Sequence, residues 1–266
     1  MSDKHSIIFG PVLSRRLGYS LGIDIIPFKT CSLDCVYCEC GKTTMLTNER
    51  KEYIPTGKII NELDMFLNNN PPHIDVITFA GSGEPLLNSG LGKIISRIKT
   101  KYPQYKTAVI TNAISLVQKN VREEITSADF ILPSVDAVFE ESFAKVNRPA
   151  KGISVDFVLN GLREFAKIYK GILWVEYFVI SGINDSKEEI SALKEYFEEI
   201  KPAKIQLNSL DRPGTCDWVK VASTKRLQEI KSAMAPLDVE IISRNFEAQR
   251  HETRIVTSKF ISRQEI

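Results

Sequence analysis

The sequence predicts an α/β protein whose core is an open, partial (βα)6 TIM-like barrel with short N- and C-terminal extensions. Short apolar runs alternate along the chain with longer segments of helical periodicity, which favours βαβ units and a parallel sheet. Several of these runs are continuous, as strands buried on both faces require. At least six strand–helix units fit within the 266 residues, whereas a closed barrel of eight units needs more strand signals than the chain contains.

The apolar runs place the expected strands at residues 20–26, 74–80, 107–111, 130–135, 173–180, 204–210 and 239–243. Helical periodicity places the expected helices between them, at residues 56–68, 91–101, 116–126, 155–169, 187–200 and 223–233. Asp185 or Ser186 is expected to cap the helix at 187–200. We expect the barrel to occupy residues 19–245, between an N-terminal extension (1–18) and a polar C-terminal tail (246–266).

The charge balance and the cysteine content restrict the class of protein. The chain has 35 basic and 33 acidic residues, so its net charge does not indicate binding to a nucleic acid or a membrane. A local basic face would still allow binding to a nucleic acid. No apolar run is long enough to cross a membrane, and the first ten residues lack the apolar core of a signal peptide. Four of the five cysteines fall within residues 31–40, which is typical of metal binding in a reducing compartment. We therefore expect a cytoplasmic protein.

Three cysteines with C-x3-C-x2-C spacing, Cys31, Cys35 and Cys38, directly follow the first expected strand. Thiolates at these intervals can hold three corners of a cubane iron–sulfur cluster and leave its fourth iron open to another ligand. A zinc site with Cys40 as fourth ligand is the alternative, but no second C-x2-C or histidine pair follows. That alternative describes a zinc- or cluster-bearing structural or redox protein without further chemistry at the site.

With Tyr37 as the aromatic residue, the loop resembles the C-x3-C-aromatic-C signature of the radical S-adenosylmethionine (SAM) superfamily. The resemblance implies an enzyme with one [4Fe–4S] cluster, SAM bound to the open iron, and reductive cleavage of SAM to a 5′-deoxyadenosyl radical. It also implies an electron donor such as a flavodoxin or ferredoxin. The family's partial barrel agrees with the strand count.

Polar residues at the ends of later strands resemble the family's SAM-binding positions, and ligand sites of such barrels form at these strand ends. Glu84 could accept a hydrogen bond from the SAM ammonium group, and the glycines before it allow close backbone approach. Together with the aromatic residue of the cysteine motif, the resemblance implies as cofactor-binding residues Tyr37, Gly81, Ser82, Gly83, Glu84, Asn112, Ser134, Asp136 and Asn208.

The N-terminal block 10–18, with Arg15 and Arg16, narrows the resemblance to a radical SAM subgroup of Fe–S oxidoreductases. This subgroup is related to wybutosine-synthesis proteins and, more distantly, to nitrogenase-cofactor assembly proteins. It does not define the substrate, which could be an RNA base, a cofactor precursor or a protein. The two arginines are either a solvated pair or bind a phosphate or carboxylate of the substrate.

Catalytic residues beyond the cluster are not identified by the sequence. Glu176 lies within an apolar strand, where a carboxylate is paired or faces the barrel interior, so it is one candidate. Cys216 could donate a hydrogen atom, although a single cysteine is more often a bystander. After Cys40 it is the only remaining cysteine, so an auxiliary cluster is not expected.

Overall fold

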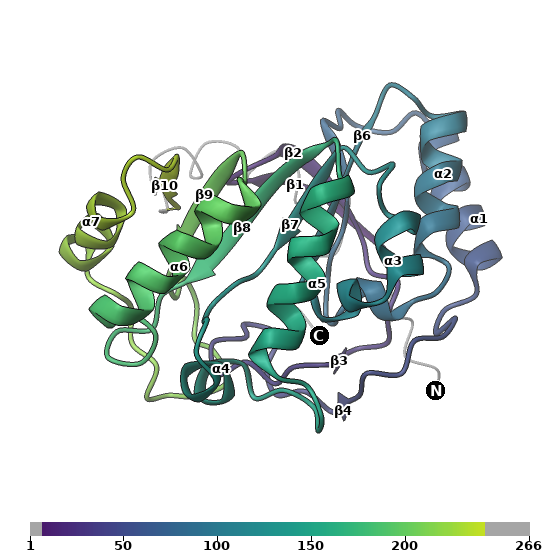
Figure 1. Cartoon of the computed structure of the whole chain (residues 1–266). Helices are drawn as coiled ribbons and strands as arrows, with labels where there is room; N and C mark the ends of the chain where they lie inside the picture. Colours follow the sequence, from purple (N-terminus) through teal and green to yellow (C-terminus); the bar gives the residue numbers. More distant parts are fainter. Residues whose placement is uncertain (1–6, 243–266) are drawn as a thin grey trace.

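The computed structural model describes residues 7–242; residues 1–6 and 243–266 lie outside the description. Its core is one eight-stranded sheet with the order β1-β2-β5-β6-β7-β8-β9-β10 (Figure 1). The first strand, β1 (Ile8–Ser14), runs antiparallel to β2 (Gly18–Ile23). The sheet continues in parallel through β5 (Val76–Phe79), β6 (Lys106–Thr111), β7 (Phe130–Pro133), β8 (Ile172–Phe178), β9 (Lys204–Asn208) and β10 (Val239–Ile241).

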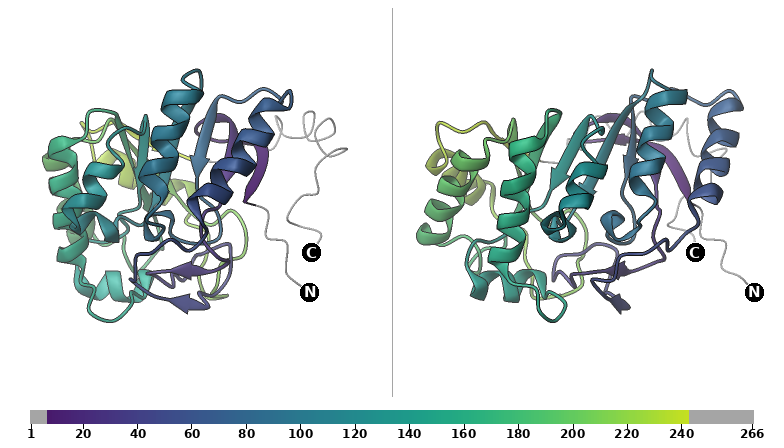
Figure 2. Two further views of the ribbon diagram at one scale, coloured as in Figure 1. Left: turned by 90° about the vertical axis from the view of Figure 1, so that its right-hand side faces the viewer. Right: turned by 45° about the vertical axis from the view of Figure 1, so that its right-hand side comes forward.

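Helices connect the parallel strands and cover the outer face of the curved sheet, except for the short helix Glu140–Asn147, which lies at the carboxyl ends of the strands (Figures 1 and 2). They are α1 (Thr56–Asn68), α2 (Leu91–Lys101), α3 (Lys119–Glu124), α4 (Glu140–Asn147), α5 (Val155–Ile168), α6 (Lys187–Ile200) and α7 (Thr224–Ala233). The edge strands β1 and β10 do not pair with each other, so the sheet is not closed. The predicted open (βα)6 barrel is confirmed: six strand–helix units are followed by β10.

Serine caps explain why several helices begin where the sequence predicts. Ser154, Ser186 and Ser223 each accept a hydrogen bond from the backbone N–H three residues later, which satisfies a donor that the helix itself leaves unpaired. Of the two candidates for the cap of α6, the structure therefore selects Ser186. The apolar face of each helix then packs on the sheet, where buried aliphatic side chains form one continuous core.

Several expected elements differ from the structure. The helix expected at 116–126 is a 3₁₀ turn, Ile114–Val117, and then α3, because Gln118 is extended between them (φ −81°, ψ 122°). Residues 8–14, placed in an N-terminal extension, form the edge strand β1. The last residue of the strand expected at 239–243 and the tail 246–266 lie outside the described residues.

The inner face of the sheet carries a small apolar cluster that is separate from the main core. Val76, Ala108 and Leu132 form its buried part, and Phe130 and Trp174 pack against it. The carboxyl ends of the strands point toward the cysteine loop and the short paired strands β3 (Thr30–Cys31) and β4 (Met45–Leu46) (Figure 1). The fold thus places the cysteines at the carboxyl ends of the parallel strands.

Candidate functional site at the carboxyl edge of the sheet

The three cysteines of the motif are half-buried free thiols on a loop that neighbouring segments hold in place. Val36 N–H donates to the carbonyl of Val146 at 2.9 Å, which joins the middle of the loop to α4. The Asp34 carboxylate accepts a 2.7 Å hydrogen bond from the backbone N–H of Thr43, which joins the motif to the segment that follows it. Backbone contacts therefore fix the path along which the thiols are presented.

Each thiol accepts a hydrogen bond from a side chain outside the motif. The pairs are Asn112 Nδ2 to Cys31 Sγ at 3.6 Å, Asn147 Nδ2 to Cys35 Sγ at 3.5 Å, and Lys29 Nζ to Cys38 Sγ at 3.1 Å. Donors placed around sulfur stabilise the thiolate form, which is the form that binds metal. From the sequence, Asn112 is predicted to be a SAM contact, and Lys29 has no predicted role.

Burial and charge act differently on the three thiols. Burial raises the pKa of Cys31 to about 12 and raises the pKa of Cys35 well above its usual value. A hydrogen bond from Cys40 and the nearby Lys29 ammonium lower the pKa of Cys38 to about 5. Because metal ligands must be deprotonated, loading this site with metal releases protons chiefly from Cys31 and Cys35.

The thiols fit a cluster better than a single metal ion. In residues 7–242, no three His, Cys, Asp or Glu side chains gather as ligands of one ion. A tetrahedral zinc site needs four donors about 2.0–2.3 Å from one point, whereas cysteines that bind a cubane attach to different iron atoms. Lys29 is only 3% exposed, and a buried ammonium beside the thiols suits an anionic occupant. The donor set therefore fits an iron–sulfur cluster.

Glu84 follows β5 and is buried at 3% exposure. Its Oε1 accepts hydrogen bonds from Leu86 N–H at 2.9 Å and from the Thr111 hydroxyl at 2.6 Å, and its Oε2 accepts one from Asn112 N–H at 2.7 Å. Burial outweighs these bonds and raises the pKa of Glu84 to about 7. The carboxylate thus joins the end of β6 to the glycine-rich turn, a structural role that is not predicted from the sequence.

The glycines of that turn are required by packing against protein. A Cβ added at Gly83 would lie 2.1 Å from the Thr30 carbonyl oxygen, and one at Gly81 would lie 2.3 Å from the Asp24 carboxyl carbon. Ser82 donates through both its backbone N–H and its hydroxyl to Asp24 Oδ2, at 3.0 and 2.7 Å. The expected reason for these glycines was close approach of a ligand; the structure shows close approach of the chain to itself.

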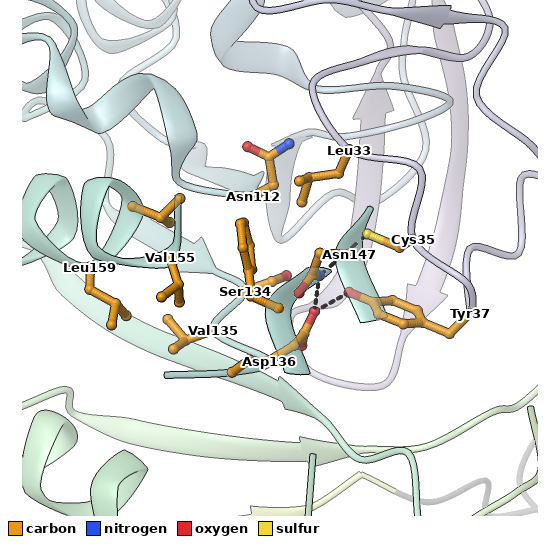
Figure 3. A pocket seen from close by; sticks show the side chains of 13 residues that line it. Leu33, Cys35, Tyr37, Asn112, Ser134, Val135, Asp136, Asn147, Val155 and Leu159 are labelled. Atoms are coloured by element: carbon orange, nitrogen blue, oxygen red, sulfur yellow. Dashed lines mark hydrogen bonds between the residues drawn. The ribbon is translucent and has the colours of Figure 1, made fainter. Parts of the chain in front are cut away.

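A small, partly open cavity of about 40 Å³ is lined by Cys35 (Figure 3). Its polar lining centres on Asp136, whose Oδ2 accepts hydrogen bonds from the Tyr37 hydroxyl at 2.6 Å and from Asn147 Nδ2 at 2.7 Å. Burial raises the pKa of Asp136 to about 6. Ser134 lines the same cavity, as do apolar side chains of α5. The structure therefore brings together four sequence-predicted positions, Tyr37, Asn112, Ser134 and Asp136.

Asn208, at the end of β9, is buried, and its Oδ1 has no hydrogen-bond partner among the described residues.

Arg16 lies inside the barrel and donates a 3.1 Å hydrogen bond to Gln206, two residues before Asn208. Arg16 also pairs with Glu176 on β8. Of the two readings of the arginines, a solvated pair is wrong for Arg16, whose side chain is only 14% exposed. Glu176, a catalytic candidate, is held by this ion pair.

Cys216 lies on the segment after β9 that packs over the cysteine loop. Its N–H donates to the Val36 carbonyl at 3.1 Å, and the Thr215 hydroxyl donates to the Cys38 carbonyl at 3.2 Å. A Cβ added at Gly214 would lie 2.9 Å from the Tyr37 backbone. The backbone contacts beside Cys216 thus join β9 to the cysteine loop.

An open (βα)6 barrel with polar side chains and a C-x3-C-x2-C loop at the carboxyl ends of its strands is typical of an α/β-barrel enzyme, and thiols with this spacing suit an iron–sulfur cluster. The family model of the radical SAM superfamily matches residues 25–193, and the chain belongs to this superfamily. Enzymes of this family use a [4Fe–4S] cluster and SAM. The resemblance seen in the cysteine motif is therefore confirmed.

Within residues 7–242, no helix has the length and apolar character needed to cross a membrane.

Curated relatives match almost the whole chain. A protein described as GTPase Obg from Brachyspira hyodysenteriae is 36% identical over 96% of this chain, but the chain spans only 38% of that protein's length. UPF0026 protein MJ1312 from Methanocaldococcus jannaschii is 35% identical over 90% of this chain and 73% of its own length.

Solved structures share the fold at low sequence identity. A radical SAM methyltransferase from Sphaerobacter thermophilus superposes with a TM-score of 0.66 at 14% identity, covering 84% of this chain and 65% of that chain. A structure of TYW1 with a lysine-pyruvate adduct bound gives a TM-score of 0.57 at 15% identity, covering 81% and 72% of the two chains. These likenesses support the partial barrel.

Proposed function

We propose that this chain binds one [4Fe–4S] cluster through Cys31, Cys35 and Cys38, and that it uses one electron to cleave SAM to methionine and a 5′-deoxyadenosyl radical. The observation that carries the proposal is the set of three half-buried thiols at the carboxyl edge of the barrel, each with its own hydrogen-bond donor. Three protein ligands leave one iron open, which is the arrangement of a catalytic rather than a structural metal site.

When bound, the cluster would supply one electron, and its open iron would supply the position for SAM. The chain's own residues hold the cluster, bind SAM and exclude water. The proposed SAM-binding set remains Tyr37, Gly81, Ser82, Gly83, Glu84, Asn112, Ser134, Asp136 and Asn208.

The hydrogen bonds within the chain distinguish the roles of three members of this set. Glu84 and Asp136 already accept several hydrogen bonds from protein donors, so we assign them to shaping the SAM site. Asn208 has a buried oxygen without a partner in residues 7–242, and such an atom is costly unless a ligand satisfies it. Asn208 is therefore our strongest candidate for a direct SAM contact.

The electron donor that we propose is a small redox protein such as a flavodoxin or ferredoxin. The substrate class stays open between an RNA base, a cofactor precursor and a protein. Arg16 and Glu176 neutralise each other inside the barrel, so this pair does not favour a charged substrate over a neutral one.

Cluster assembly tests the ligand set. We expect anaerobic reconstitution of the full chain to give four iron and four sulfide per chain, and Cys31→Ala, Cys35→Ala and Cys38→Ala each to lose most of both. The matched control is Cys40→Ser, which should keep the cluster. If tight zinc were bound instead, and lost on Cys40→Ser, the zinc alternative would replace this proposal.

A further inference from the structure

Lys29 is a buried, charged residue that has no role in the proposed binding of SAM. The residue is 3% exposed, and its ammonium donates to Cys38 Sγ at 3.1 Å. No carboxylate in residues 7–242 forms an ion pair with it. A buried ammonium is costly unless a negative group compensates it. The negative charge that Lys29 faces must therefore come from the thiols or from what they bind.

The backbone directs Lys29 to this position. Its φ of 54° lies in the left-handed region, which residues other than glycine adopt uncommonly. Three backbone hydrogen bonds of 3.1 Å hold it there: Lys29 N–H donates to the Ser82 carbonyl, and the N–H groups of Thr44 and Met45 donate to the Lys29 carbonyl. Contacts from two other segments thus fix a backbone conformation that aims the side chain at Cys38.

We propose that Lys29 is a positioning residue that raises the reduction potential of the cluster. This inference rests on the proposed function. Reduction adds one electron from the external donor to the cluster and so makes the site more negative. A fixed cation at a ligand sulfur stabilises the reduced form more than the oxidised form, because charge and hydrogen bonds at the sulfurs set the potential.

The amides of Asn112 and Asn147 act in the same direction on the other two sulfurs. Their donor–sulfur distances of 3.6 and 3.5 Å are longer than that of Lys29, and neither group carries a charge. Charge-assisted hydrogen bonds are about twice as strong as neutral ones. Lys29 is therefore expected to have the largest effect of the three donors.

The test is a redox titration of the reconstituted chain without SAM, followed by electron paramagnetic resonance. Lys29→Met keeps the length of the side chain but removes the charge and the donor. We expect about a tenfold decrease in the equilibrium constant for one-electron reduction, which corresponds to a potential lower by about 59 mV. Lys29→Arg should retain most of the wild-type potential. Lys42→Met removes the same charge from an exposed lysine of the same loop and should leave the potential unchanged.

Equal potentials in wild type and Lys29→Met, at equal iron and sulfide content, would overturn the inference. Loss of the cluster from both Lys29→Met and Lys29→Arg would also overturn it, because the shape of the side chain would then be the requirement. If only Lys29→Met loses the cluster, the reduction potentials of Lys29→Gln and Lys29→Arg are compared, because these two variants differ in charge. Equal potentials in the two variants would contradict the inference. A wild-type chain that takes up no cluster would instead contradict the proposed function.

Discussion

The Tyr37 hydroxyl donates a 2.6 Å hydrogen bond to the Asp136 carboxylate, and the Tyr37 ring stacks on Phe178 with centroids 3.9 Å apart. Asp136 also accepts from the backbone N–H of Phe178 at 3.0 Å. The aromatic residue of the cysteine motif is therefore a half-buried connection from the loop to the ends of β7 and β8, and Figure 3 shows its contact with Asp136.

Replacing Tyr37 by Phe tests this connection. The ring and its stacking remain, but Asp136 loses one hydrogen bond inside a buried site. We expect the free energy of unfolding to fall by about 1–3 kcal/mol, as measured by urea denaturation of the cluster-free chain. Tyr37→Leu, which also removes the stacked ring, should cost more. Equal stability of wild type and Tyr37→Phe would show that the hydrogen bond contributes nothing to the fold.

Protonation of Glu84 should contribute to the pH dependence of the free energy of unfolding. Burial raises its pKa from 4.5 to about 7, so the folded chain binds this proton more tightly than the unfolded chain. Protonated Glu84 therefore contributes to the free energy of unfolding fully below about pH 4.5, and this contribution is lost as the pH rises through about 7. The total loss is up to about 3 kcal/mol. Urea denaturation at pH 5 and pH 8 measures the change in wild type and in Glu84→Gln. The variant should lack this component, and identical changes in both proteins would contradict it.

Gly83 should be intolerant of a side chain. In Gly83→Ala, the new Cβ would meet the Thr30 carbonyl oxygen at 2.1 Å, and a backbone atom cannot move aside cheaply. We expect a loss of stability of about 1–3 kcal/mol and a lower iron content after reconstitution, because Thr30 precedes Cys31. The matched control is Gly57→Ala in α1, where nothing lies within 4 Å of the new atom. That variant should gain about 0.5–1 kcal/mol, and a harmless Gly83→Ala would disprove the close packing.

A double-mutant cycle on Arg16 and Glu176 measures their coupling inside the barrel. Both side chains are less than 15% exposed, so removing one leaves the other charge buried without its partner. We expect each of Arg16→Met and Glu176→Gln to destabilise the chain by about 3 kcal/mol, and the double variant to cost less than the sum. Additive effects in urea denaturation would mean that the ion pair is not a stabilising contact in solution.

The sequence predicted much of the fold because its signals are local. The bounds of α1, α2 and α6 match the predicted ranges, since an apolar face repeats along each helix. The strand β1 was missed because its antiparallel pairing with β2 begins within a segment that contains Gly10 and Pro11 and has no clear alternation. Local periodicity does not report which segment a strand pairs with.

The candidate site, like the fold, was predicted where its signal is local in the sequence. The cysteine spacing is a local pattern, and the three residues were found from it. The donors around the sulfurs come from distant segments: Asn147 reaches Cys35 across 112 positions, and Asn112 reaches Cys31 across 81. Lys29 lies near the motif in sequence, but only the fold shows that it is buried and aimed at Cys38.

The most direct test of the account is the formation of 5′-deoxyadenosine from SAM by the reconstituted chain under anaerobic reduction with dithionite. We predict product from the wild type and none from Cys35→Ala, measured by chromatography with SAM-only and reductant-free controls. A wild-type chain that carries a full cluster and yields no 5′-deoxyadenosine would contradict the central claim. Product from Cys35→Ala equal to that of the wild type would show that the ligands have been assigned wrongly.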